Sequence, residues 1–137
     1  MRKFIKIIGW VLLFIAFFTA FFMFVSTFFG IDKYLVVSGS MEPELYAGDI
    51  AIVNRNVEFQ DVEIGDIIIF RYNDMNIIHR VIDETVIDGE KYLKTKGDAN
   101  KCDDGYLTAT DNYLGTTLFH IPKVFGFMVD FYNLIYK

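Results

Sequence analysis

The sequence predicts a mainly β domain that follows one N-terminal membrane-spanning helix. Three observations support this: a long uncharged apolar run near the N-terminus, several short strand-like runs separated by turn residues, and no long helical period between residues 35 and 120. A chain of 137 residues with 53% hydrophobic residues suffices for one such domain and is too apolar for disorder. We therefore expect a basic segment and anchor (1–30), a β domain (31–123) and an apolar C-terminal segment (124–137).

The anchor is predicted from residues 7–29, which carry no charge and include eight phenylalanines. A helix of this length crosses a hydrocarbon core of about 30 Å. A cleaved signal peptide would combine a shorter apolar run with a small-residue cleavage site, and the sequence has neither feature. We therefore favour a retained, single-pass anchor in the lipid bilayer.

Charge is distributed unevenly about this span. Arg2, Lys3 and Lys6 precede it without any acidic residue, which predicts a cytoplasmic N-terminus. The β domain is then expected on the outer face of the cell membrane, or in the lumen of the endoplasmic reticulum in a eukaryote. After the span, 18 acidic residues oppose ten basic ones, a net charge of −8. This balance argues against nucleic acid as a partner.

The strands of the β domain are predicted from β-branched and alternating runs between turn residues. Residues 31–37 are expected to be a connector into a strand. Asn73-Asp74 and Asp88-Gly89 are predicted hairpin turns. Gly48 and Gly65 begin two similar Gly-Asp-Ile runs, which we interpret as a turn feeding a strand, used twice. Strands are expected at residues 49–54, 66–72, 76–83, 85–87, 90–95 and 113–119.

The C-terminal segment, residues 124–137, is apolar and aromatic, and its polar residues are spaced so that they form one narrow stripe on a helix. Fourteen residues are too few for a comfortable second span. Two alternatives remain open: a helix in the membrane interface, or a helix or strand that closes the core of the β domain.

Three clusters contain side chains that can carry chemistry. Residues 38–43 place Ser38 and Ser40 in a tight turn, which taken alone is typical of an ordinary loop. His79 shares one face of its strand with apolar residues; a neutral imidazole there can accept a proton from a serine, although a lone histidine is more often structural. His120, near a strand end, is interpreted as structural. The third cluster, residues 94–104, contains Asp98, Asp103 and Asp104 in a turn-like composition.

No metal or organic cofactor is predicted. Cys102 is the one cysteine, so neither an intramolecular disulfide nor a multi-cysteine metal site can form. Two separated histidines do not make a zinc site, and the aspartates lack the alternate oxygen ligands and closing glutamate of a calcium loop.

The order of these motifs resembles the type I signal peptidases. An N-terminal anchor is followed by Ser-Gly-Ser-Met-Glu-Pro (38–43), Gly-Asp-Ile-Ile-Ile-Phe (65–70), His-Arg-Val (79–81) and Thr-Lys-Gly-Asp-Ala-Asn (95–100), with an Asp pair at 103–104. Because a histidine stands where Lys-type bacterial members have lysine, the chain is similar to the ER-type branch, found in the ER complex, in archaea and in some Gram-positive bacteria. Gly-Asp-Ala-Asn departs mildly from that branch's Gly-Asp-Asn-Asn.

The resemblance implies roles for individual residues. Ser40 matches the nucleophile, His79 the general base and Asp104 the acidic third member of a catalytic triad. Asp98 matches a supporting residue; because it lies in a tight turn, we expect its carboxylate to bond its own backbone. Ser38 matches the position that helps to bind the oxyanion, together with the backbone N–H of Ser40.

The implied fold is the antiparallel β domain of signal peptidases, and the implied activity is removal of signal peptides from secreted preproteins through an acyl-enzyme. The implied enzyme is a serine endopeptidase, and its substrates carry small side chains at positions −1 and −3. The alternative is a catalytically inactive, membrane-anchored β domain that serves as a binding or scaffold subunit. The sequence does not say whether partner subunits are needed.

Overall fold

The computed structural model describes residues 2–122 and 134–135. It divides into two compact units, Met1–Ile31 and Asp32–Lys137, which we describe separately. The expectation for residues 124–137 falls outside the described residues except at Leu134 and Ile135.

The first unit is a single helix, α1 (Arg2–Phe28). Its segment Lys3–Ser26 has the length and apolar composition needed to cross a membrane. Polar side chains inside it bond their own helix: the Thr19 hydroxyl donates to the Ile15 carbonyl and the Ser26 hydroxyl to the Met23 carbonyl, each at 2.8 Å. Such bonds satisfy hydroxyl groups where water is absent.

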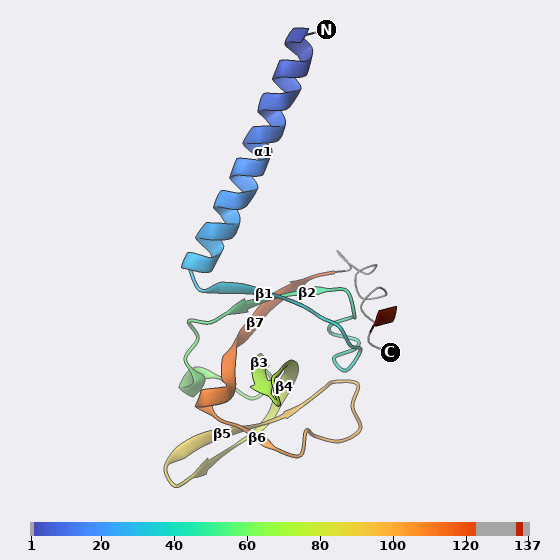
Figure 1. Cartoon of the computed structure of the whole chain (residues 1–137). Coiled ribbons are helices and arrows are strands. Elements are labelled where there is room, and N and C mark those ends of the chain that lie inside the picture. The colour runs from blue at the N-terminus through green and yellow to red at the C-terminus, as the bar shows by residue number, and fades with distance from the viewer. Residues whose placement is uncertain (1, 123–133, 136–137) are drawn as a thin grey trace. The chain divides into compact units, whose positions relative to one another are not determined.

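The second unit is a seven-stranded antiparallel sheet with the order β1-β2-β7-β3-β4-β5-β6 (Figure 1). Among the described residues from 35 to 120, the helical segments are two short 3-10 turns, Phe59–Asp61 and Thr110–Asn112. The predicted mainly β fold is therefore confirmed. The strands are β1 (Ile31–Leu35), β2 (Ile50–Asn54), β3 (Ile67–Tyr72), β4 (Met75–Ile87), β5 (Glu90–Lys96), β6 (Leu107–Thr108) and β7 (Tyr113–Ile121).

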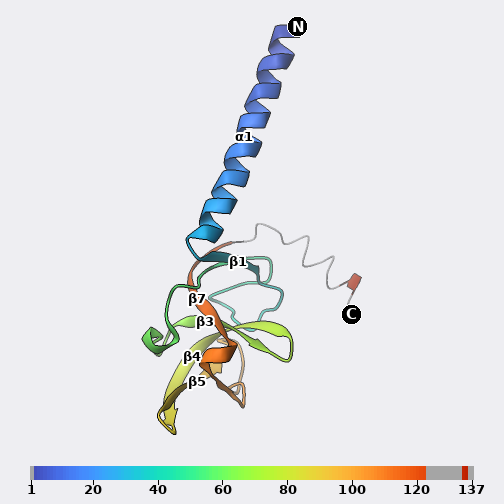
Figure 2. The ribbon, with the colours of Figure 1, turned by 60° about the vertical axis from the view of Figure 1, so that its left-hand side comes forward.

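Both predicted hairpin turns are present. Asn73, Asp74, Asp88 and Gly89 all have positive φ, the conformation that a two-residue hairpin turn requires. The second turn closes the long β4–β5 hairpin (Figure 2).

Two details of the strand prediction differ from the structure. Residues 76–83 and 85–87 are one strand, because a register shift between Val81 and Asp83 absorbs the break in the alternating pattern. The expected connector at residues 31–37 contains an edge strand, β1, which pairs with β2.

The two similar Gly-Asp-Ile runs are equivalent turns. Gly48 and Gly65 both have positive φ. In each run the following aspartate accepts a hydrogen bond from the backbone N–H three residues earlier, Asp49 at 2.9 Å and Asp66 at 3.0 Å. The carboxylates thereby fix the turns that lead into β2 and β3.

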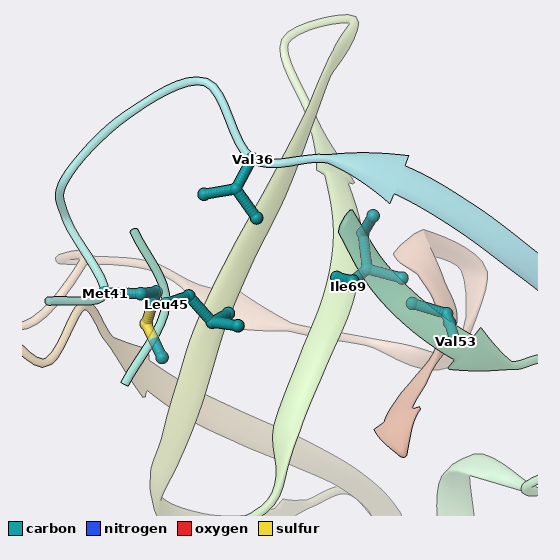
Figure 3. Packing of buried hydrophobic residues seen from close by; sticks show 6 residues of the cluster. Val36, Met41, Leu45, Val53 and Ile69 are labelled. Carbon is teal, nitrogen blue, oxygen red and sulfur yellow. The ribbon is translucent and has the colours of Figure 1, made fainter. Parts of the chain in front are cut away.

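The core of the β unit consists of two clusters that share the alternating residues of β3. Ile69 packs in the first cluster, whereas Ile68 and Phe70 pack in the second. In the first cluster, Met41 and Leu45 from the loop after β1 are 1% exposed (Figure 3). Their burial anchors the loop that carries Ser40 against the sheet.

Candidate active site

Ser40 lies in a loop that is fixed at both ends. Before it, Val36 makes backbone hydrogen bonds with the two residues that precede β2: its N–H donates to the Asp49 carbonyl, and its carbonyl accepts from the Gly48 N–H. After it, Met41 is buried in the first core cluster. The Ser40 carbonyl also accepts the Ala99 N–H at 2.9 Å, which joins this loop to the loop that follows β5.

His79 projects from β4 into the second cluster's side of the sheet. Ile77 and Val81, which alternate with it, both pack with that cluster, as the sequence pattern predicts. The imidazole is edge-on to the buried Phe70 ring at a centroid distance of 6.5 Å. Only 10% of its side chain is exposed, so the ring has little freedom to rotate.

A continuous hydrogen-bonded series connects Ser40, His79 and Asp104. The Ser40 Oγ and His79 Nε2 atoms are 3.2 Å apart, and His79 Nδ1 is 2.7 Å from Asp104 Oδ2. With the proton on Nδ1, the imidazole donates to Asp104 and its Nε2 accepts the Ser40 hydroxyl proton. The Asp104 side chain is 6% exposed, so this acceptor sits away from solvent. Ser40 lies 39 positions before His79 in sequence and Asp104 lies 25 positions after it, so the fold brings distant segments together at the imidazole.

The other two aspartates of the cluster point elsewhere. Asp98 accepts a two-pronged hydrogen bond from Arg80, with Nε to Oδ1 at 2.9 Å and Nη2 to Oδ2 at 2.7 Å. Its side-chain hydrogen bond raises the pKa of Arg80. The expectation that Asp98 bonds its own backbone was therefore wrong, because a guanidinium on the adjacent strand offers a stronger, charged donor. Asp103 pairs with Lys94 at 2.9 Å, which lowers the pKa of the Asp103 carboxyl.

An open cleft of about 370 Å³ lies beside the series. Its lining consists of residues 35–38, 40–41 and 75–79, together with Asn100. The lining is mostly apolar, and its polar side chains include those of Ser40 and His79. Ser38, predicted at the oxyanion position, places its Oγ 3.3 Å from the Ser40 Oγ. His120 lies on β7, with its Nε2 3.9 Å from the Asp49 carboxylate, and does not line this cleft.

Gly97 lies where the Ser40 loop and the His79 imidazole come together, and its lack of a side chain leaves space for both. A Cβ atom built there would stand 2.6 Å from the Ser40 carbonyl oxygen and 2.9 Å from His79 Nε2. Both distances are shorter than any ordinary contact of a Cβ atom. The glycine is therefore required by packing at the site.

Aromatic rings pack beside the acidic end of the series. Tyr106 stacks on Tyr72 at 3.8 Å and meets Phe70 edge-on at 6.1 Å. Burial, together with the negative charge of Asp104, raises the pKa of Tyr106 to about 12. Tyr106 is neutral at physiological pH, as an unperturbed tyrosine would also be, so it adds no charge beside Asp104.

Sequence reasoning missed Arg80 and Thr95. Arg80 holds Asp98, and its Nη1 also donates to the Gly65 carbonyl at 2.8 Å. Thr95 is completely buried, and its hydroxyl donates to Asp104 Oδ2 at 2.6 Å. A signal for Thr95 exists in the sequence: Leu93 and Thr95 alternate with lysines, so the threonine occupies the buried face, where a polar group must find a partner.

The fold and the site define a class. A hydroxyl, an imidazole and a buried carboxylate in hydrogen-bonded series, beside a cleft, form the arrangement of a serine hydrolase triad. The protein family described as "Signal peptidase, peptidase S26" matches residues 6–103. The chain therefore belongs to the signal peptidase family.

Its curated relatives include fungal proteins named "Signal peptidase complex catalytic subunit SEC11". The protein of Colletotrichum graminicola is 36% identical over 100 residues, covering 66% of this chain and 58% of the relative. The protein of Scheffersomyces stipitis is 35% identical over 101 residues, covering 66% and 59%. The protein of Komagataella phaffii is 33% identical over 105 residues, covering 66% and 60%. The matches thus span about three fifths of these relatives.

Proposed function

We propose that this chain is a membrane-bound serine endopeptidase that removes signal peptides from secreted preproteins. The observation that carries the proposal is the Ser40–His79–Asp104 hydrogen-bonded series in a chain of the signal peptidase family. Signal peptide removal also accords with the names of the fungal relatives, which are catalytic subunits of a signal peptidase complex.

The proposed reaction proceeds through an acyl-enzyme. His79 Nε2 takes the Ser40 hydroxyl proton while Oγ bonds to the carbonyl carbon of the scissile peptide. The tetrahedral intermediate collapses, the C–N bond breaks, and His79 passes its proton to the leaving amine. His79 then takes a proton from water, whose oxygen attacks the ester, and returns that proton to Ser40. Asp104 holds the Nδ1–H of the imidazole and stabilises the imidazolium that forms twice in the cycle.

The developing oxyanion is assigned to Ser38 and to the backbone N–H of Ser40. The Ser38 hydroxyl is 3.3 Å from the attacking oxygen, close enough to donate to an oxygen on the carbonyl carbon that Ser40 attacks. Removing one such donor costs about 10²–10³ in turnover.

The substrate is assigned to the cleft as an extended chain. The β4–β5 ladder begins at the pair Arg80 and Lys96, so residues 75–78, which line the cleft, lie beyond its reach. A peptide can add to such a strand edge by backbone hydrogen bonds, and its side chains at alternate positions then meet the apolar wall. This mode suits the small residues expected at positions −1 and −3 of a signal peptide.

Helix α1 is assigned as a retained membrane anchor with a cytoplasmic N-terminus. Lys3 and Lys6 lie at its N-terminal end, and the 24-residue segment Lys3–Ser26 is apolar enough to span a bilayer. Anchoring would hold the enzyme in the membrane to which its substrates are delivered, which raises their effective concentration. Protease treatment of sealed vesicles tests this orientation: the β domain should resist protease added on the cytoplasmic side, and digestion from that side would refute it.

The decisive experiment is cleavage of a preprotein, with small residues at −1 and −3, by the purified chain in detergent. Ser40→Ala should abolish cleavage without changing the thermal unfolding midpoint, because it removes the attacking oxygen and little else. Ser26→Ala, the matched change in helix α1, should cleave like the wild type. Cleavage by Ser40→Ala within tenfold of wild type would refute Ser40 as the nucleophile and favour the scaffold alternative.

A further inference from the structure

Thr95, the first residue of the Thr-Lys-Gly-Asp-Ala-Asn motif, contacts the carboxylate of Asp104 directly. Its Oγ1 donates to Asp104 Oδ2 at 2.6 Å, and this is the same oxygen atom that His79 Nδ1 approaches at 2.7 Å. The Asp104 backbone N–H in turn donates to the Thr95 carbonyl at 3.0 Å. One residue thus holds both the main chain and the side chain of Asp104.

The Thr95 hydroxyl is itself held rigidly. The residue is 0% exposed and lies in β5, opposite Val81 on β4, two positions from His79. Branching at Cβ restricts χ1, and complete burial leaves the Thr95 side chain little room to move, so its hydroxyl is held against Asp104. Because β4 carries His79 and β5 carries Thr95, the pairing of the two strands fixes the distance between imidazole and donor.

Two of the charged side chains nearby, those of Arg80 and Lys94, are engaged with other partners. The Arg80 guanidinium donates hydrogen bonds to the Asp98 carboxylate and to the Gly65 carbonyl. Lys94 is paired with Asp103. The Asp104 carboxylate accepts hydrogen bonds from the Thr95 hydroxyl and from the imidazole of His79, and each bond affects how strongly the carboxylate attracts a proton on the imidazole.

We propose that Thr95 is a positioning residue of the triad: its hydroxyl pins Asp104 Oδ2 where His79 donates, and so selects the Nδ1–H tautomer that leaves Nε2 free for Ser40. The proposal rests on the proposed function for its catalytic consequence. Its physical core, control of His79 through Asp104, can be tested without turnover.

Thr108 offers a matched control for a merely structural role. It is 1% exposed, lies on the neighbouring strand β6, and its hydroxyl has no hydrogen-bond partner among the described residues. Thr95→Val and Thr108→Val thus remove the same group from equally buried sites. They differ in whether that group touches the Asp104 carboxylate.

The first test measures preprotein cleavage against pH for these variants and for Thr95→Ser. Thr95→Val should lower kcat about tenfold, the equivalent of one lost hydrogen bond to a charged group, with KM unchanged. Its acidic limb should move to higher pH, because a carboxylate with one donor fewer holds the protonated imidazole more tightly. Thr95→Ser should restore both quantities, and Thr108→Val should match wild type. Equal profiles for Thr95→Val and wild type would overturn the proposal.

The second test needs no turnover. In the Ser40→Ala background, NMR follows the ring signals of His79 against pH, with His120 as an internal reference. Thr95→Val should move the His79 titration curve to higher pH and leave that of His120 unchanged. Thr95→Ala carries the same expectation if the valine variant does not fold. An unmoved midpoint refutes the positioning role. A moved midpoint in a chain whose wild type cleaves no preprotein would uphold it and refute the proposed function instead.

Discussion

Two neighbouring residues of β4 hold two carboxylates in very different ways. His79 and Arg80 each contact an aspartate from the segment after β5, and both closest contacts measure 2.7 Å. The His79–Asp104 pair is 10% and 6% exposed, whereas the Arg80–Asp98 pair is 30% and 20% exposed. Adjacent strand residues point to opposite faces, so one step along the chain separates a buried pair that faces Ser40 from a wetter pair outside the cleft.

The difference shows how this small domain divides its tasks. The wetter pair is charged and two-pronged, and Arg80 also grips the Gly65 carbonyl, so it ties together the turn before β3, strand β4 and the loop after β5. The two members of the buried pair are joined by one contact, between His79 Nδ1 and Asp104 Oδ2, and the other ring nitrogen of His79 faces Ser40. We infer that the first pair maintains the loop geometry and that the second performs the chemistry.

Replacing the buried imidazole tests this division most severely. His79→Lys should lower preprotein cleavage by about 10⁴-fold, even though Lys-type relatives use lysine, because a lysine base must be neutral. The Asp104 carboxylate at this position would keep the ammonium charged. Turnover of the purified variant in detergent measures the effect. Activity within tenfold of wild type would mean that the pocket tolerates a neutral lysine and that Asp104 is not tied to the base.

Gly97 connects the two pairs, since it precedes Asp98 and touches the triad. Gly97→Ala should lower turnover by at least about 100-fold, because the added Cβ must push apart the Ser40 carbonyl and His79 Nε2, and misplacement of about 1 Å costs that much. Gly9→Ala is a control for glycine replacement as such, since Gly9 lies in helix α1 and an added Cβ would meet no atom within 4 Å. Unchanged turnover in Gly97→Ala would show that the loop yields without disturbing the triad.

The smallest expected effect concerns the ring beside Asp104. The pKa of Tyr106 in the folded protein, about 12, exceeds its ordinary value of 10.0, so the folded state binds this proton more tightly than the unfolded chain. That stabilisation is complete below pH 10 and is lost as pH rises towards 12. Tyr106→Phe keeps the ring but removes the titration. Its unfolding free energy, measured by denaturant titration, should fall less steeply than that of wild type between pH 10 and 12. Parallel curves would contradict this.

Sequence reasoning recovered what depends on local chemistry. The turns at Asn73-Asp74 and Asp88-Gly89 follow from backbone preferences, and the face that His79 shares with Ile77 and Val81 follows from strand alternation. These properties are determined within a few residues. They could therefore be predicted without any knowledge of the tertiary fold.

What the sequence did not reveal depends on pairing between distant segments. The partner of Asp98 is Arg80, 18 residues away, and its identity follows from the β4–β5 register and not from the turn in which Asp98 lies. The contact between Thr95 and Asp104 likewise requires the loop after β5 to fold back. The choice of Asp104 over Asp103 as the partner of His79 came from family resemblance, since alternation alone says only that the two point apart.

The most direct test of the division between the two pairs compares Asp104→Asn with Asp98→Asn, using Asp103→Asn as a surface control. Turnover and thermal unfolding midpoint are measured for all three. Asp104→Asn should lower turnover by about 10⁴-fold, as expected when a triad aspartate can no longer hold the imidazole tautomer. Asp98→Asn should lower the midpoint by about 5 °C and keep turnover within about tenfold, because it breaks a charged pair away from the cleft. Asp103→Asn should change neither greatly. Near-normal turnover in Asp104→Asn, with turnover lost in stable Asp98→Asn, would contradict the account.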